Sequence, residues 1–270
     1  ELPELFIHRE RKRARLAMIA GVLSLGAAYL FDSRYELKSD LYPANVCYNI
    51  ALAFQRTAQT QSYAKTSKDF TFQAKSVHPP KNREVYVMVI GETSRSANWS
   101  IYGYNRETTP KLSKVKGLTA FCHVLTESNT THKSVPMLMS SVSAHDFNSI
   151  YQQKSIITTF KEAGYQTAFF SNQRYNHSFI DFFGKEADTC NFIKENVKHA
   201  NYNPSDDELL ELVATELAKN APKQFIVLHT YGSHFNYRER YPSENAFFLP
   251  DFPVDAEVKY KDNLVNAYDN

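Results

Sequence analysis

The stretch Val85–Tyr104, VYVMVIGETSRSANWSIYGY, decides the fold of this chain. It opens with the short apolar run Val85–Ile90, which is typical of a strand buried on both faces of a sheet. A Gly-Glu-Thr turn at residues 91–93 follows at once and delivers a carboxylate and a hydroxyl. Ligands of open α/β sheets bind beyond the carboxyl ends of parallel strands. The stretch therefore predicts a reaction site that includes Glu92.

Strand and helix patterns keep alternating downstream. Ser155–Ala163 and Ser205–Lys219 have helical patterns, whereas Gln166–Phe170 and Gln224–His229 have strand patterns. This alternation predicts an α/β fold, a mostly parallel sheet flanked by helices on both faces. Polar groups follow three of the strands, and we expect them to converge on one edge of the sheet. They are Glu92-Thr93, Asn172-Gln173, and His229 through His234.

The N-terminal region predicts a membrane anchor. Leu16–Phe31 has sixteen residues without a charge, slightly fewer than the ~20 of a usual membrane span. Snorkelling by Arg15 and interfacial aromatic residues can extend it, so we expect a transmembrane helix at residues 14–31. Basic residues crowd its N-terminal side, which places everything after Asp32 outside the cytoplasm. A buried core helix is the alternative.

Three parts are expected along the chain. Residues 1–38 would be the end of a membrane domain, and residues 39–84 an amphipathic helix followed by a linker. The helix pattern is Asp40–Ala58, and the polar Gln59–Glu84 contains two adjacent prolines. Residues 85–270 would be the N-terminal part of a catalytic domain.

Composition narrows the function further. A net charge of +2 argues against nucleic acid as the main partner. Cys47, Cys122 and Cys190 permit one disulfide outside the cytoplasm, and their spacing does not resemble a zinc knuckle. The chain lacks an initial Met and stops within the helix-like pattern Ala256–Asn270. We interpret both ends as cuts in a longer protein.

Glu92 and several threonines are candidates for metal-assisted chemistry. Glu92 suits a hard oxygen ligand, but the dipole of a helix at Thr93–Trp99 would explain it equally well. A divalent cation would lower the pKa of a threonine nucleophile. Spacing slightly favours Thr93, while Thr130 and Thr131 start a helix whose free N–H groups suit a phosphate. Local sequence favours ordinary capping by the latter two.

His234 follows a strand and a Gly-Ser turn. This position suits a phosphate-binding or proton-donating imidazole, with a structural histidine as the alternative.

Five segments in one order resemble the phosphoethanolamine transferases of bacterial envelopes. The family modifies lipid A or core sugars and includes colistin-resistance enzymes. The segments are GETSRSANWSIYGYNRETTPKL, NTTHKSVPMLMS, KEAGYQTAFFSNQ, HTYGSHFNYRERYP and LVNAYDN, and the resemblance covers Val85–Asn270. It implies an alkaline-phosphatase-like fold, a Zn²⁺ site, and an enzyme of the bacterial inner membrane with its catalytic domain in the periplasm.

The resemblance also implies a role for each candidate residue. Glu92 becomes a zinc ligand, and Thr131 becomes both a ligand and the nucleophile, which overrules the spacing preference for Thr93. One catalytic histidine and three substrate-binding residues are implied as well, namely His234, Asn172, Gln173 and His177.

Two departures from the family pattern stand out. The remaining Asp and His zinc ligands are expected beyond residue 270, so the chain as given would bind zinc weakly or not at all and be inactive. Members that modify lipid A bracket the nucleophile with a disulfide. Glu127 and Met137 stand at those positions here, so this disulfide is not available.

The leading hypothesis is a two-step transfer. Thr131 would take phosphoethanolamine from phosphatidylethanolamine and pass it to a lipid A or lipopolysaccharide acceptor. A phosphoglycerol transferase or another sulfatase-like phosphotransferase or hydrolase is an alternative. Sulfatase activity itself is disfavoured, because Lys133 and Val135 stand where a sulfatase needs Pro and Arg. A non-catalytic membrane-anchored binding domain is the third hypothesis.

Overall fold

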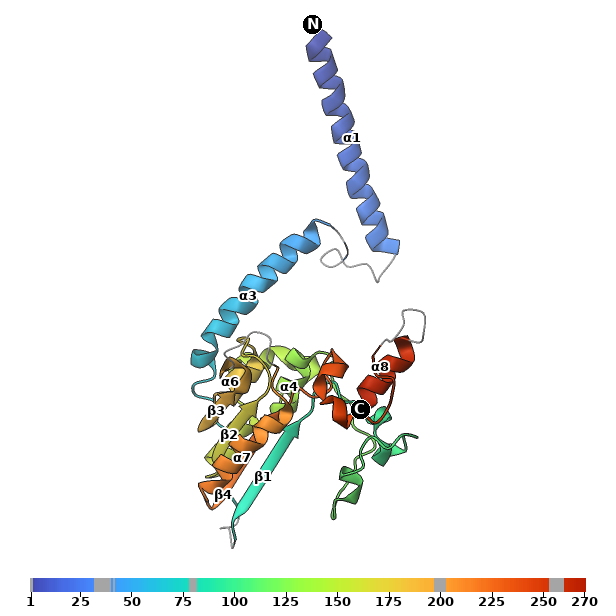
Figure 1. The fold of residues 1–270 in the computed structure, drawn as a ribbon. Coiled ribbons are helices and arrows are strands. Elements are labelled where there is room, and N and C mark those ends of the chain that lie inside the picture. Colours follow the sequence, from blue (N-terminus) through green and yellow to red (C-terminus); the bar gives the residue numbers. More distant parts are fainter. Residues whose placement is uncertain (1, 32–39, 41, 78–81, 197–202, 253–259) are drawn as a thin grey trace. The chain divides into compact units, whose positions relative to one another are not determined.

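The structure is a computed structural model (Figure 1) that describes all residues except 1, 32–39, 41, 78–81, 197–202 and 253–259. The chain divides into two compact units, Glu1–Thr66 and Ser67–Asn270.

The first unit contains helices α1 (Leu2–Phe31) and α3 (Ala44–Thr66). The expected transmembrane helix at residues 14–31 falls within α1. The N-terminal half of this helix contains Arg15 and other basic residues. Only its last sixteen residues are therefore free of charge. Within the described residues, no helix is both long and apolar enough to cross a membrane. The structure therefore does not confirm the expected span.

Helix α3 differs from the expectation in its length. It continues to Thr66, so the first residues of the predicted linker Gln59–Glu84 are helical. Val46, Ile50 and Phe54 recur every four residues and are exposed, as an amphipathic helix requires. Leu41 of the expected helix Asp40–Ala58 lies outside the described residues.

The second unit is built on a four-stranded parallel sheet, which confirms the predicted fold class. Its strands lie in the order β1-β4-β2-β3. Their bounds are β1 Glu84–Ile90, β2 Gln166–Ser171, β3 Thr189–Phe192 and β4 Lys223–His229. The sequence did not indicate β3, because four residues with one buried side chain carry little periodic signal.

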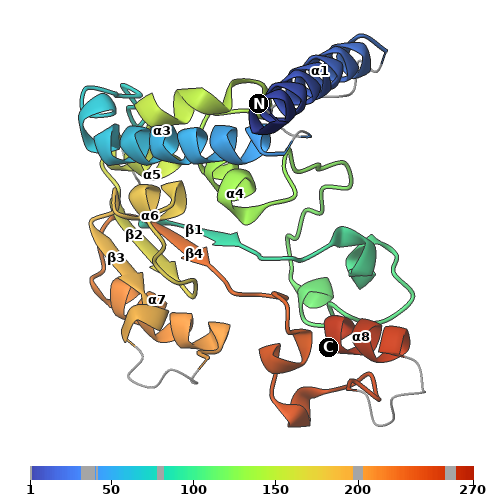
Figure 2. The same cartoon turned by 90° about the horizontal axis from the view of Figure 1, so that it is seen from above.

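Helices cover both faces of this sheet (Figure 2). On one face, α7 (Leu209–Ala218) packs Leu209 against Phe170 and Ile226 of the central strands. On the other face, α5 (Ile156–Glu162) stacks Phe160 on Phe225, with ring centroids 3.9 Å apart. Helix α6 (Phe179–Gly184) lies on the same face as α5, and Gly184 permits its close approach. A Cβ there would lie 2.6 Å from the Phe169 ring.

Strand β1 is an edge strand, which corrects the expectation that it is buried on both faces. Only Ile90 is buried within it, whereas Val87 and Val89 are 46% and 61% exposed. Apolar composition alone cannot separate an edge strand from a central one. The last residue, Ile90, is nevertheless fixed by pairing with His229, so the turn that follows is anchored.

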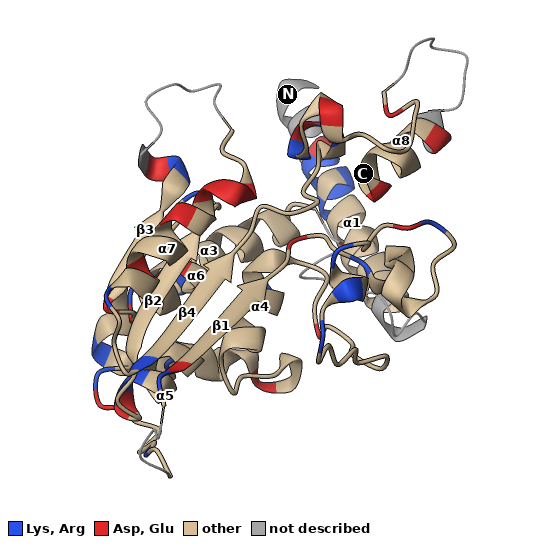
Figure 3. Cartoon of the chain, turned by 60° about the horizontal axis from the view of Figure 1, so that its bottom comes forward, with Lys and Arg blue, Asp and Glu red and all other residues tan. Residues whose placement is uncertain are grey.

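Charged residues avoid the middle of the sheet and lie at its ends (Figure 3). At the carboxyl end, Ser205 forms a capping box with Glu208 over the acidic turn that leads into α7. The remaining helices are α4 (Thr131–Met139) and α8 (Tyr260–Asp269); residues 256–259 of the expected C-terminal helix are not described. Short 3₁₀ turns lie at Ser96–Asn98, Ser100–Tyr102, Leu112–Lys114, Ala144–Gln152, Ile193–Asn196, Asp206–Glu208, Tyr237–Arg240 and Ser243–Asn245.

All three cysteines are free thiols. Burial raises the pKa of Cys190 to about 11, so this thiol is protonated and unreactive at neutral pH.

Candidate active site

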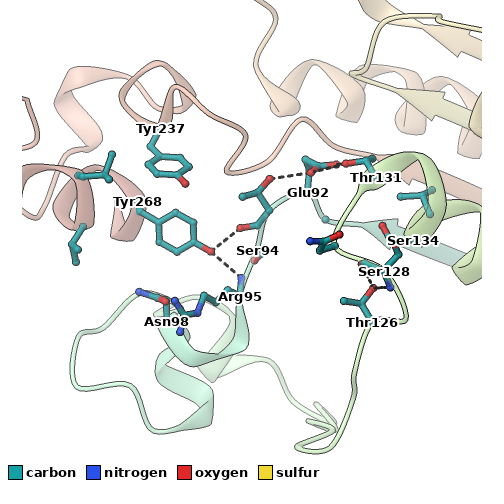
Figure 4. A pocket seen from close by; sticks show the side chains of 16 residues that line it. Glu92, Ser94, Arg95, Asn98, Thr126, Ser128, Thr131, Ser134, Tyr237 and Tyr268 are labelled. Carbon is teal, nitrogen blue, oxygen red and sulfur yellow. Dashed lines mark hydrogen bonds between the residues drawn. The ribbon is translucent and has the colours of Figure 1, made fainter. Parts of the chain in front are cut away.

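Glu92 and Thr131 face one another at the carboxyl end of β1 (Figure 4). The Thr131 hydroxyl donates to the Glu92 carboxylate, with its Oγ1 atom 3.1 Å from Oε1 and 3.0 Å from Oε2. Glu92 is 9% exposed, so its charge is largely withdrawn from water. A hydroxyl held against a buried carboxylate is oriented for proton loss and nucleophilic attack.

Thr131 is the first residue of α4, and its hydroxyl does not cap the helix. The N-cap is Thr130, whose side chain makes no capping hydrogen bond, although its carbonyl accepts from the backbone of Lys133 and Ser134. The capping role favoured by local sequence is therefore not what the structure shows. The Thr131 side chain instead reaches across to Glu92.

Thr93 also contacts the carboxylate, so contact with Glu92 does not by itself identify which threonine is the nucleophile. Its Oγ1 donates to Glu92 Oε1 over 2.9 Å, and its backbone has a φ of 54°. This left-handed conformation is rare for a β-branched residue. The segment 93–99 contains only a 3₁₀ turn at Ser96–Asn98, so a helix dipole does not account for Glu92.

A tight turn at residues 230–234 packs directly against Glu92. The Ser233 N–H donates to the Glu92 carbonyl over 3.1 Å. Gly232 has a φ of 49°, and a Cβ there would lie 2.7 Å from the Glu92 carbonyl oxygen, so only glycine fits. The Asp206 carboxylate accepts from the backbone N–H groups of Tyr231 and Gly232 over 2.7 and 2.8 Å. Asp206 therefore fixes the turn that supports Glu92.

His229 ends β4 and is fully buried. Burial lowers its pKa to about 4, and the charges of Glu92 and Asp206 oppose that shift only in part. The imidazole is therefore neutral at pH 7. Its Nε2 atom is buried and has no hydrogen-bond partner among the described residues. A buried ring nitrogen of this kind is open to a ligand.

His234 lies at the end of the turn. Its ring stacks on Tyr231, with centroids 4.7 Å apart, and its Nδ1 is 2.8 Å from the Phe235 carbonyl oxygen. A carbonyl only accepts, so Nδ1 carries a proton in this contact. The Nε2 atom then remains available for proton exchange.

The three predicted substrate-binding residues lie in different environments. Gln173 lines the cavity beside Thr131, and its amide donates to the Thr230 carbonyl over 2.9 Å. Asn172 is 0% exposed and donates to Pro204 and Asp206, so it supports the turn rather than facing the cavity. His177 is exposed beside Tyr175 and is not part of the cavity wall.

Two cavities meet at the Glu92–Thr131 pair, which lines both of them together with Asn129. The tyrosine cavity, about 640 Å³, has a wall that includes Tyr237 and Tyr268. The histidine cavity, about 470 Å³, is lined by the imidazoles of His132, His229 and His234 together with Arg174 and Lys194.

Sequence reasoning missed both cations of the histidine cavity and also Asp206. The expectation that polar residues after a strand end line the site selected Asn172-Gln173. It stopped one residue short of Arg174, which directly follows Gln173. Lys194 follows β3, the strand that the sequence did not reveal.

Glu92 and Thr131 fit two positions of a zinc site. Zn²⁺ accepts carboxylate oxygens, and both oxygens of this buried carboxylate face the threonine hydroxyl. Within the described ranges, no group of three or more His, Cys, Asp or Glu side chains is arranged to hold a metal ion. The expected zinc site therefore stays a prediction, with two oxygen donors in place.

Residues 84–270 match the family model described as Sulfatase. The chain therefore belongs to the sulfatase family.

Individual relatives define the resemblance more narrowly. A Kdo(2)-lipid A phosphoethanolamine 7''-transferase from Escherichia coli strain K12 is 31% identical over 222 residues, 79% of this chain and 38% of that protein. The zinc complex of the C-terminal periplasmic domain of EcEptC from Escherichia coli is 26% identical, with a TM-score of 0.62 over 70% of this chain and 55% of that one. The soluble domain of lipooligosaccharide phosphoethanolamine transferase A from Neisseria meningitidis is 27% identical, with a TM-score of 0.62 over 73% and 60% of the two chains.

These relatives confirm the resemblance to phosphoethanolamine transferases. The chain spans less than two thirds of the length of each of them.

Proposed function

We propose that the protein transfers phosphoethanolamine from phosphatidylethanolamine to lipid A or a lipopolysaccharide core sugar, through a covalent intermediate on Thr131. The observation that carries this proposal is the Thr131 hydroxyl held against the buried Glu92 carboxylate at the start of α4. The similarity to phosphoethanolamine transferases supplies the substrate class.

In the first step, the Thr131 oxygen attacks the phosphorus of the donor lipid. Glu92 is placed to take the hydroxyl proton, because both of its oxygens accept from Thr131. The bond from phosphorus to the diacylglycerol oxygen breaks, and that oxygen takes a proton from solvent water as diacylglycerol leaves. The positive end of the α4 dipole lies at Thr131 and would stabilise the negative charge of the phosphate.

In the second step, an acceptor oxygen attacks the phosphorus and the bond to Thr131 breaks. His234 is positioned to take the acceptor's proton, because its Nδ1 is occupied by the Phe235 carbonyl and its Nε2 is free. The Thr131 oxygen regains from Glu92 the proton that this carboxylate took in the first step. Gln173 and the neutral His229 line the same cavity and offer hydrogen bonds to the bound phosphoethanolamine group.

Glu92 and Thr131 would hold a zinc ion in the complete site. When bound, zinc lowers the pKa of a coordinated hydroxyl and neutralises phosphate charge.

The proposal includes a membrane location. We place the catalytic unit in the periplasm, with residues 1–38 at the inner membrane and α3 on its surface. The related EcEptC domain is described as periplasmic. The exposed row Val46, Ile50 and Phe54 on α3 provides an apolar face for the lipid boundary.

The test compares Thr131→Ala with Thr93→Ala, because both threonines contact the same carboxylate. The full-length protein is incubated with phosphatidylethanolamine or with phosphatidylglycerol, and the intact protein mass and the lipid A products are measured. We expect a phosphoethanolamine adduct from the first lipid only, which is lost in Thr131→Ala and retained in Thr93→Ala. An adduct that survives in Thr131→Ala, or that forms from phosphatidylglycerol, would contradict the proposal.

A further inference from the structure

Arg174 and Lys194 bring two cations into the histidine cavity without a matching ion pair. Both side chains line the cavity that contains Thr131. Among the residues that the structure describes, neither is within ion-pair distance of a carboxylate. Unpaired cations in a concave site are a common arrangement for binding an anion.

The surroundings of Lys194 concentrate positive charge further. Its Nζ atom lies 3.0 Å from the centroid of the Tyr231 ring, and the Arg240 guanidinium carbon lies 4.3 Å from the same centroid. Burial, followed by the charges of Arg240 and Arg174, lowers the pKa of Lys194 to about 8. The lysine therefore remains mostly charged at pH 7, and an anion beside it would relieve the repulsion.

The carboxylates near these cations already have other partners. Asp206 accepts from the backbone of Tyr231 and Gly232. Asp181 is 1% exposed and accepts from the backbone of Asn176 and Ser178. Glu92 accepts from both threonine hydroxyls. The buried, unpartnered Nε2 atom of His229 lines the same cavity and also points to a ligand there.

We propose that Arg174 and Lys194 form a subsite for an anionic group, a phosphate or a carboxylate, on the acceptor. This rests on the proposed function. The donor lipid brings one phosphate, which Thr131 attacks at the start of α4, so a second cationic position in the cavity is left for the molecule that arrives next. Arg174 supplies a planar fork and Lys194 a point charge, a combination that binds phosphate and carboxylate oxygens. The subsite would select anionic acceptor sugars over neutral ones.

The experiment separates the two steps in the full-length protein. Lys194→Met and Arg174→Met remove one charge each and leave a flexible, unbranched side chain in its place. Lys185→Met is the matched control, because Lys185 also lies over a tyrosine ring, 4.2 Å from the centroid of Tyr175, but does not line the cavity. Adduct formation on Thr131 is followed by intact mass, and transfer is measured with a core-sugar acceptor that carries a phosphate and with its dephosphorylated form. Binding of inorganic phosphate is measured by calorimetry.

For each cavity variant, we expect the KM for the phosphorylated acceptor to rise about tenfold or more, since a charge-assisted hydrogen bond is lost. Adduct formation should stay within about threefold of the wild type, the neutral acceptor should not distinguish the proteins, and inorganic phosphate should bind more weakly. Equal slowing of adduct formation would overturn the proposal, because the cations would then serve the donor. Unchanged phosphate binding would overturn it as well. A wild-type protein that forms no adduct refutes the proposed function, while the phosphate titration still decides the subsite.

Discussion

The tyrosine cavity and the histidine cavity share Glu92, Asn129 and Thr131 but differ in the rest of their walls. In the tyrosine cavity, Leu264, Val265 and Tyr268 of α8 form an apolar and aromatic side. The histidine cavity has imidazoles and two cations instead. The proposed nucleophile, Thr131, thus faces two chemical environments.

Under the proposed function, the two cavities have different parts in the reaction. In the proposed mechanism, the donor phosphate and the anionic group of the acceptor bind on the histidine side, where the start of α4 and the two cations lie. The tyrosine side has only Arg95 besides Glu92 as a charged residue among the described residues that line it. We therefore expect changes on the two sides to have unequal effects, and changes to the shared pair to have the largest.

The largest effect is expected from Glu92→Gln. The amide keeps the shape but removes the charge that accepts the Thr131 proton, so kcat/KM should fall by about 10² to 10³. Adduct formation on Thr131, measured by intact mass over time, reports the change. Glu107→Gln, an exposed site away from both cavities, is the control and should behave like the wild type. A rate within tenfold of the wild type would remove Glu92 from the proposed mechanism.

The next prediction concerns the pH dependence of the free energy of unfolding, and it involves a residue of the histidine cavity only. The folded pKa of His229 is about 4, below the ordinary histidine pKa of 6.5, so the unfolded chain binds more protons between these pH values. The stability contributed by the neutral imidazole is complete above pH 6.5 and is lost as the pH falls toward 4, by at most about 3 kcal/mol. Urea unfolding at pH 7.5 and pH 4.5, with a chelator present, measures it.

Two histidine variants serve as controls for that measurement. His229→Gln should flatten the pH dependence over this range, since the titrating group is gone. His123→Asn, at an exposed position, should leave it unchanged. If His229→Gln retains the full pH dependence, another group is responsible.

A smaller effect is expected from Asp206→Asn, which weakens the support of the turn on the histidine side. The amide cannot accept at both positions from Tyr231 and Gly232, so the free energy of unfolding should fall by about 2 kcal/mol. The neighbouring Asp207→Asn is the control, because Asp207 is exposed and its side chain does not contact the turn. Equal stability of the two variants in urea unfolding would show that the turn does not depend on the carboxylate.

The two sides of the site also differ in how much the sequence revealed. The expectation that polar residues at strand ends line the site found Glu92, Gln173, His229 and His234, because each ends a strand with a clear apolar run or lies in the turn that follows it. It also selected Asn172, whose side chain turns away from the cavity, since sequence order does not fix side-chain direction. Lys194 was missed with the short strand β3.

The part of the tyrosine cavity that α8 forms was not predicted. This helix approaches Glu92 through contacts between residues far apart in the chain. Arg106 pairs with Asp269 over 3.0 Å, and Asn98 donates to the same carboxylate over 2.9 Å. Local patterns hold no information on such long-range pairs. The edge position of β1 was not predicted either, because strand order depends on pairing between strands far apart in the chain.

The smallest effect is expected from Tyr268→Phe on the tyrosine side. The Tyr268 hydroxyl accepts from the Arg95 N–H over 2.9 Å and donates to the Thr93 carbonyl over 2.7 Å, so it ties α8 to the segment after Glu92 (Figure 4). Removing it should cost about 1 kcal/mol in unfolding free energy and change the rate of adduct formation by less than about tenfold. Tyr237→Phe is the matched control, because this ring packs on Tyr268 with centroids 5.0 Å apart and its hydroxyl makes no hydrogen bond within the described residues. A loss of activity as large as that of Glu92→Gln would mean that the tyrosine cavity takes part in the chemistry as directly as the histidine cavity. This outcome would contradict the proposed difference between the two cavities.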